Sequence, residues 1–495
     1  MSDNIKTITK RSSVFFVGKI FDSFLMFIVN IIGARVLGAN SYGTYVYVFT
    51  FMMMCSIMIK IGLDQGLSAI LPKYDDKDIE RQVVSFSIVS VFLISIAVII
   101  VTFIFSDFIA IHLLNNKKFG EHLIKFVPLL LFLPIVQLSE GIFRTIGGIR
   151  HYIIAKNILV PVCIFLSLIF QILVLDYKSV YTLLYSNYFG WIICVVYIGV
   201  ILFRKGYISL PKLEYKNIYI KLIGLSLPLI FVGLLNYLMG RIDSYMIGYM
   251  IDGASVGIYN VADKVAYISS FLFVAVSSMF APGIASIYHN KDYDKLTRTY
   301  KKLTRLILIV NVGVFFLILI NSNDILKIFG QEYKAGNLTL IILALAYLIN
   351  ASFGPIVYMN AMTGKEKNEF YVSLSMLIIN VAANYVFINL YGLVGAAYAT
   401  VIVFSIGNIC RLIILYRNLK IAPFSIKYFM VIGNGIIVYI LTYTIIEFIK
   451  VDNYILRIFI YSTIYVILYL AGVWLFSIEN NEKQEIISIC RKREV

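Results

Sequence analysis

The sequence predicts an all-α integral membrane protein, and three observations support this class. Of the 495 residues, 60% are hydrophobic and 14% are charged, against roughly 45–50% and 25% in soluble domains. Continuous apolar runs recur along the whole chain and are long enough to cross a bilayer as helices. They lack the alternation of polar and apolar residues that marks the strands of membrane barrels. We therefore expect about 14 transmembrane helices and no sizeable soluble domain.

The apolar runs give the expected helices in chain order. Their approximate bounds are 14–37, 43–66, 83–105, 124–145, 153–175, 180–203, 222–248, 257–280, 304–320, 337–361, 370–389, 395–415, 428–448 and 455–477. The first run is too long for a signal peptide and lacks an obvious cleavage site, so we expect it to be a retained span.

The basic residues predict the orientation of these spans. The net charge of +16 would suggest nucleic acid in a soluble chain, but in a polytopic protein it arises when Lys and Arg collect in cytoplasmic loops. With the N-terminus inside, the cytoplasmic segments hold 30 of the 43 Lys and Arg residues and the outer segments hold eight. This bias places both termini in the cytoplasm, as an even number of spans requires, and no nucleic-acid partner is expected.

The chain also repeats itself. GANSYGTY at residues 38–45 matches GASVGIY at residues 253–259, and a weaker match relates residues 148–152 to residues 364–368 at nearly the same offset. Each repeat contains six spans, so both copies enter the membrane in the same direction and are expected to be related by a pseudo-two-fold axis along its normal. We expect two six-helix lobes, residues 1–215 and 216–424, followed by a helix pair and cytoplasmic tail at 425–495.

Several functional classes lack their sequence signals. No phosphate-binding GxxxxGK[ST] motif occurs, which argues against direct use of ATP. The four histidines and five cysteines form no metal-binding pattern, so no metal or other cofactor is expected. The outer loops are short for a glycosyltransferase or polymerase, and the sequence therefore favours a transporter over an enzyme.

Charged residues inside the predicted spans are the strongest functional signal, because each costs about 2.5–3.5 kcal/mol at a helix centre and usually faces a polar interior. In the first span Lys19 and Asp22 lie on one helical face and are expected to form an ion pair. In the fourth span Glu140 and Arg144 continue a polar stripe toward the cytoplasmic end. A buried structural pair is the alternative for Lys19 and Asp22, and snorkelling to the membrane surface is the alternative for Arg144.

The seventh and eighth spans carry a second group of charges. Arg241 and Asp243 are two residues apart and point to different sides of a helix, so each is expected to need another partner or a ligand. Asp263 shares a face with Tyr267 in the next span, whereas Lys264 is displaced by about 100°.

Several motifs together resemble the polysaccharide flippases (Wzx-like) of the multidrug/oligosaccharidyl-lipid/polysaccharide exporter superfamily. They are ARVLG at 34–38, YGTY at 42–45, RIDS at 241–244, GIYNVA at 257–262 and YGLVGAAYAT at 391–400. The resemblance covers nearly the whole chain. It implies two six-helix lobes around a central cavity, alternating access, and a lipid-linked oligosaccharide that is moved across the bacterial inner membrane.

Such a substrate has an anionic diphosphate head, which needs cations in a sheltered groove. The candidates for binding it are Arg241, Lys19, Arg35, Arg144 and Lys264, and those for orienting these bases or coupling transport to Na⁺ or H⁺ are Asp22, Asp243, Asp263 and Glu140. The expected partners are membrane lipids, the glycan-linked lipid and a polysaccharide polymerase. A small-molecule antiporter of the same fold, a lipid II flippase, and a membrane glycosyltransferase or polymerase are the alternatives.

Overall fold

All regular secondary structure in the described part of the chain is helical, which confirms the predicted class. The computed structural model describes residues 2–74, 76–115, 119–449, 451–478 and 482–484. The chain forms two compact units, residues 1–257 (unit 1) and 258–495 (unit 2). The boundaries expected at 215 and 424 concern the internal repeats rather than compact units, and they stay a prediction.

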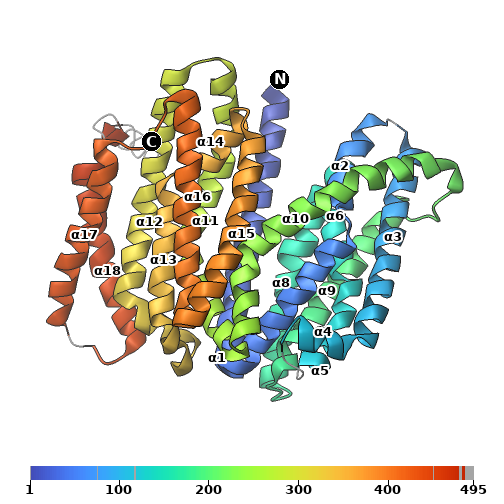
Figure 1. The fold of residues 1–495 in the computed structure, drawn as a ribbon, viewed down its shortest axis with the longest axis horizontal. Helices are drawn as coiled ribbons and strands as arrows, with labels where there is room; N and C mark the ends of the chain where they lie inside the picture. The colour runs from blue at the N-terminus through green and yellow to red at the C-terminus, as the bar shows by residue number, and fades with distance from the viewer. Residues whose placement is uncertain (1, 75, 116–118, 450, 479–481, 485–495) are drawn as a thin grey trace, which may run out of the picture. The chain divides into compact units, whose positions relative to one another are not determined.

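Unit 1 is built mainly from long helices joined by short ones (Figure 1). Within it α8 packs along α9, α2 along α6, and α1 along α10. Its elements are α1 (Ser2–Ile59), α2 (Leu63–Ile70), η1 (Leu71–Lys73), α3 (Lys77–Ile104), α4 (Ser106–His112), α5 (Phe119–Phe126), η2 (Val127–Leu131), α6 (Leu133–Thr145), α7 (Ile149–Tyr152), η3 (Ile153–Leu159), α8 (Val160–Leu173), α9 (Val180–Arg204), η4 (Leu213–Tyr215) and α10 (Lys216–Met250).

Unit 2 holds most of α11 and all later helices (Figure 1). In this unit α16 packs against both α13 and α15, and α12 packs against α13, α17 and α18. Its elements are α11 (Gly253–His289), α12 (Tyr293–Phe329), η5 (Gln331–Gly336), α13 (Asn337–Ser352), α14 (Ile356–Met362), α15 (Glu366–Tyr391), α16 (Leu393–Leu419), α17 (Ile426–Glu447), α18 (Tyr454–Gly472) and η6 (Val473–Ser477).

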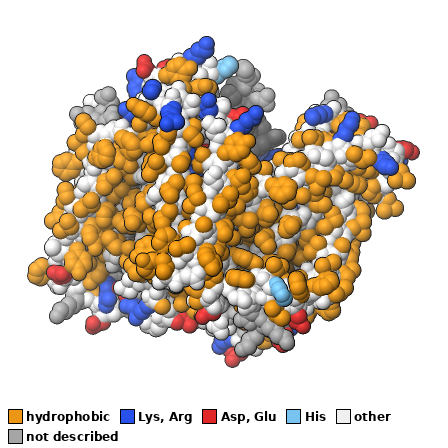
Figure 2. Space-filling view, viewed as in Figure 1, with side chains coloured by type: hydrophobic (Ala, Val, Ile, Leu, Met, Phe, Trp, Pro, Cys, Tyr) orange, Lys and Arg blue, Asp and Glu red, His pale blue; other side chains and the backbone are white. Residues whose placement is uncertain are grey.

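Twelve helical segments among the described residues are long and apolar enough to cross a membrane. One of them, Gly18–Lys73, covers most of the first predicted span and all of the second, and α11 covers the eighth. On the face shown in Figure 2, hydrophobic side chains cover the middle of the helices and charged side chains gather near the helix ends. The helices therefore agree with a prediction of about 14 spans, and the chain is a multi-pass membrane protein.

α1 shows how one long helix supplies two spans. A straight helix of its 58 residues would be about 87 Å long, nearly three times the roughly 30 Å hydrocarbon core. The helix breaks at Gly38, whose φ of 75° and ψ of 167° are not helical. Glycine adopts a positive φ at little cost because it has no Cβ atom. The first copy of the repeated glycine motif thus begins where the chain reverses (Figure 1).

The two copies of that motif contact each other within unit 1. A Cβ atom at Gly43 would lie 1.8 Å from the carbonyl oxygen of Gly253, and one at Gly257 would lie 2.4 Å from that of Ala39. Only glycine fits at either position, because the opposing atoms belong to backbone that cannot move aside. Each copy therefore offers a glycine to the carbonyl of the other, which is the reciprocity that a two-fold axis between the copies requires.

The C-terminal helix pair α17 and α18, together with Glu482 beyond it, contacts α12 at three levels within unit 2. Arg305 lies 2.6 Å from Glu482, and Arg457 lies 3.3 Å from Asp324 near the opposite end of α12. Between these ion pairs lies a shared apolar core. Its buried members are Leu308, Val312, Phe316, Tyr428, Val431, Val438, Tyr465, Tyr469 and Val473. The pair is thus an integral part of unit 2.

Candidate functional site

Five charged side chains and one tyrosine from four elements of unit 1 lie near one another. α1 and α6 each contribute two charged residues, η3 contributes a lysine beside the Trp191 ring of α9, and α7 contributes the tyrosine. We call this group the unit 1 charge cluster; its members are Lys19, Asp22, Glu140, Arg144, Tyr152 and Lys156.

The partner of Asp22 is Lys156 and not Lys19. The Lys156 ammonium nitrogen lies 3.5 Å from Asp22 Oδ2, and the two side chains are 27% and 22% exposed. Lys19 is near enough to attract Asp22 electrostatically, but no carboxylate of a described residue lies within 4.0 Å of it. The predicted ion pair within the first span is therefore wrong, because Asp22 is matched by a neighbouring helix.

Only one of the two carboxylate oxygens of Asp22 has a hydrogen-bond partner among the described residues. Its Oδ1 atom is buried and has no hydrogen-bond partner among the described residues. A buried carboxylate oxygen without a donor is costly and gains from a proton or a cation. Asp22 is thus placed to take up a positive charge besides Lys156.

Lys156 lies where the helix is widened. Residues Ile153–Leu159 form a π-helix, and Pro161, at the start of α8, has no N–H to bond the carbonyl of residue 157. π-helical turns occur frequently at functional sites. Gly18 allows close approach here, since a Cβ atom on it would lie 2.6 Å from Ile153. The Lys156 nitrogen also lies 5.5 Å from the centre of the Trp191 ring, within cation–π range.

The expected polar stripe on the fourth span is present on α6. Arg144 forms an ion pair with Glu140 one turn away, and Tyr152 donates a hydrogen bond of 3.2 Å to Glu140 Oε2. The Arg144 side chain is 56% exposed, so its guanidinium group stays accessible. Glu140 therefore orients Arg144 without burying it.

The other predicted residues are divided between the two units. In unit 1, Arg35 is exposed, Arg241 and Asp243 are half-buried, and no carboxylate of a described residue lies within 4.0 Å of Arg241. In unit 2, Asp263 accepts a 2.6 Å hydrogen bond from Tyr347, and Lys264 is half-buried. Only four of the nine predicted site residues, Lys19, Asp22, Glu140 and Arg144, belong to the unit 1 charge cluster.

Sequence reasoning missed Lys156 and Tyr152. Lys156 lies near the start of the fifth predicted span, where a lysine is easily assigned to the membrane surface. The available signal was Pro161, which follows one turn later and disturbs the helical hydrogen bonds. A charged residue beside a helix irregularity inside a span indicates a functional site more strongly than a charged residue alone.

Known proteins match this chain in sequence. Residues 8–288, more than half of the chain, match the family described as polysaccharide biosynthesis protein, and residues 228–386 match the MatE family. The capsular polysaccharide biosynthesis protein CapF of Staphylococcus aureus is 24% identical, covering 78% of this chain and 94% of CapF. The probable low-salt glycan biosynthesis flippase Agl15 of Haloferax volcanii is also 24% identical, covering 81% of this chain and 82% of Agl15.

Solved structures match the fold. The lipid II flippase MurJ, in an inward closed conformation, has a TM-score of 0.76 at 16% identity, covering 93% of this chain and 98% of MurJ. An inward-facing multidrug resistance MATE family transporter of the MOP superfamily has a TM-score of 0.66 at 15% identity, covering 80% and 94% of the two chains. The resemblance drawn from the motifs is confirmed, and the chain belongs to the polysaccharide biosynthesis protein family.

Proposed function

We propose that this protein is a flippase that carries an undecaprenyl-diphosphate-linked oligosaccharide from the inner to the outer leaflet by alternating access. Its family and its similarity to CapF and Agl15 support a glycan as the cargo. The proposed location is the bacterial cytoplasmic membrane with both termini in the cytoplasm, which the distribution of Lys and Arg supports. The protein is proposed to act as a transporter and not as an enzyme.

The observation that carries this proposal is the composition of the unit 1 charge cluster. It contains three bases, Lys19, Arg144 and Lys156, against two acids, Asp22 and Glu140. Charges among membrane-spanning helices are expensive, so a surplus of bases is best explained by an anionic ligand that completes the cluster. A diphosphate has several acceptor oxygens and can bind more than one of these bases at once.

The geometry suggests how binding and coupling are linked. When a diphosphate group binds the Lys156 ammonium group, the carboxylate of Asp22 loses its nearest counterion. Because Asp22 Oδ1 already lacks a partner among the described residues, Asp22 then gains from taking up a proton or Na⁺. Asp243 and Asp263 are further candidates for this role.

Arg241, Arg35 and Lys264 are proposed as further contacts of the diphosphate along its path. Arg241 is the first of these, because it is half-buried and no described carboxylate lies within 4.0 Å of it. A polysaccharide polymerase that receives the flipped product is the proposed protein partner.

The test is transport by the purified full-length protein in liposomes. Undecaprenyl diphosphate carrying a fluorescent oligosaccharide is placed in both leaflets, and a membrane-impermeant reagent measures how much reaches the outer one. We expect transport that depends on protein and on an imposed ion gradient. Transport of a cationic dye without transport of the lipid would instead favour an antiporter. Transport of lipid II alone would favour cell-wall synthesis, and formation of a glycosidic bond would favour an enzyme.

A further inference from the structure

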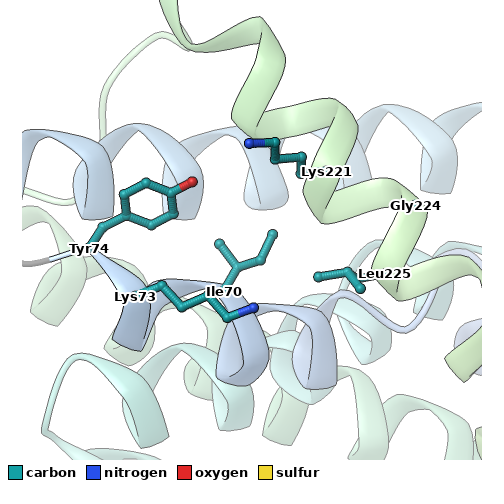
Figure 3. A pocket seen from close by; sticks show the side chains of 6 residues that line it. All are labelled: Ile70, Lys73, Tyr74, Lys221, Gly224 and Leu225. Carbon is teal, nitrogen blue, oxygen red and sulfur yellow. The ribbon is translucent and has the colours of Figure 1, made fainter.

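A pocket separate from the unit 1 charge cluster lies between the end of α2 and the beginning of α10, both within unit 1. Its volume is about 440 Å³. Figure 3 shows the side chains from the two helices facing the same space. The lining residues are Ile70, Lys73, Tyr74, Lys221, Gly224 and Leu225.

The two walls of the pocket are built differently. Lys221, Gly224 and Leu225 follow one another at i, i+3 and i+4, which places them on one face of α10. The other wall is formed by Ile70 at the end of α2, Lys73 in η1 and the extended residue Tyr74. α2 runs toward its connecting loop and α10 runs away from one, so the helix directions are opposite. Both lysines therefore lie at the loop end, and the apolar residues Ile70 and Leu225 lie at the deeper end.

The deep end of the pocket is closed by close helix packing. A Cβ atom at Gly66 would lie 1.9 Å from the Ser226 hydroxyl oxygen, and one at Gly62 would lie 2.5 Å from the Ser226 carbonyl oxygen. At Gly224, two residues nearer the loop, an added Cβ atom would meet nothing within 4 Å. The two helices thus touch at depth and separate toward the membrane surface.

The loop end of the pocket is lined by two lysines. No carboxylate in the described ranges lies within 4.0 Å of the Lys73 or Lys221 ammonium nitrogen. The Tyr74 hydroxyl points toward Lys221 (Figure 3). It can donate one hydrogen bond to an oxygen atom of a ligand. The long side chains of Lys73 and Lys221 end on opposite sides of Ile70 in Figure 3, and by turning toward the pocket they and Tyr74 can supply hydrogen-bond donors to the oxygens of a phosphate.

The deeper end of the pocket is apolar and open. Leu225 is 45% exposed although it belongs to a membrane-spanning segment. A ligand held by the lysines could therefore extend an apolar chain along α10 into the bilayer. This polarity matches a phospholipid and not a free anion.

We propose that this pocket binds the headgroup of an anionic phospholipid such as phosphatidylglycerol. Lys73 and Lys221 bind the phosphate, Tyr74 donates to it or to the glycerol, and the first acyl methylenes lie beside Leu225. The volume corresponds to that of roughly 15 water molecules, which is enough for a glycerophosphate group and a few methylenes. Both walls adjoin loops predicted to be cytoplasmic, so the lipid belongs to the inner leaflet, and the site does not depend on which substrate is flipped.

The test is lipid binding to the full-length protein, measured by native mass spectrometry. Dioleoyl phosphatidylglycerol is titrated against the wild type, against Lys73→Ala/Lys221→Ala, and against the control Lys212→Ala/Lys216→Ala. The control removes the same charge from the same region, at exposed residues that do not line the pocket. We expect the first binding constant to weaken on the order of tenfold or more in the pocket variant and less than about twofold in the control.

A second variant separates pocket shape from charge. Gly224→Leu fills the pocket while both lysines remain, and the open space at Gly224 allows the protein to fold. We expect this variant to lose phosphatidylglycerol binding, and Lys73→Arg/Lys221→Arg to retain it. Any one of four results overturns the proposal: equal weakening in both lysine pairs, equal binding of phosphatidylethanolamine, undiminished binding to Gly224→Leu, or displacement of the lipid by millimolar inorganic phosphate.

Discussion

Two ion pairs among the helices, one in each unit, are arranged in different ways. In unit 2, Arg411 lies 2.7 Å from Glu369, and their side chains are only 10% and 13% exposed. In unit 1, the Asp22–Lys156 pair is longer, is more exposed, and has Lys19 as an additional base nearby. Closely matched, buried charges hold helices together, whereas loosely matched, accessible charges remain available to a ligand.

How closely two charges are paired tells more about their role than the number of charges in a helix does. Glu369 and Arg411 connect α15 to α16, which also pack closely along their length, so their ion pair reinforces an existing contact. Lys156 instead projects from a π-helix and spreads its interactions over a carboxylate and an indole ring. A diphosphate can replace the first of these contacts without separating helices.

The largest expected effect is on stability in unit 2. Glu369→Ala leaves Arg411 buried without its counterion, which typically costs about 3–5 kcal/mol. The melting temperature of the purified protein in lipid nanodiscs should fall strongly. Transport per folded molecule should stay near the wild-type value, because the pair has no proposed contact with substrate.

A double variant tests the cause of that loss. Glu369→Met/Arg411→Met removes both charges and should recover most of the melting temperature, as replaced buried ion pairs often do. If the double variant is as unstable as the single one, the loss comes from packing and the assigned role of the ion pair is wrong.

The next effect is on transport in unit 1. Lys156→Met keeps a long side chain but removes the ammonium group that we propose contacts the diphosphate. We expect transport in liposomes to fall by roughly a hundredfold, equivalent to about 2.7 kcal/mol at 1.36 kcal/mol per factor of ten. The melting temperature should change less than in Glu369→Ala. A variant that transports normally would remove Lys156 from the mechanism.

The sequence was sufficient to predict the fold because each span is a local signal. Hydropathy located the helices, and the glycine motif was recognised as a repeat, but the break at Gly38 and the contact between Gly43 and Gly253 were found only in the structure. Ion pairs between residues that are close in the sequence could also be predicted. Lys60 and Asp64, only four positions apart in the sequence, lie 2.8 Å apart across the turn between α1 and α2.

Partners on different helices could not be predicted in this way. Asp22 was paired with Lys19 because both lie on one helix face, whereas its partner Lys156 lies 134 positions later in the chain. The Glu369–Arg411 pair was missed for the same reason, since 42 positions separate its members. Periodicity predicts which face of a helix is polar, but the identity of the neighbouring helix depends on packing of the whole bundle.

A smaller effect is expected at the unpartnered oxygen of Asp22. Asp22→Asn keeps the shape of the side chain but removes its charge and its capacity to bind a proton or Na⁺ in exchange. We expect a transport rate that is about tenfold lower and no longer responds to an imposed pH or sodium gradient. The rate should be measured with each gradient separately. A variant that keeps a full response to one gradient would exclude Asp22 from coupling to that ion.

The smallest effect is expected for an ion pair whose side chains are largely exposed to solvent. Lys178 and Asp176 lie 2.5 Å apart, closer than Lys156 and Asp22, but their side chains are 50% and 81% exposed in the loop between α8 and α9. Exposed ion pairs contribute about 0–1 kcal/mol because water and salt screen them. Lys178→Ala should therefore change neither the melting temperature nor the transport rate measurably. A large loss of transport in this variant would show that exposure does not separate incidental charges from functional ones.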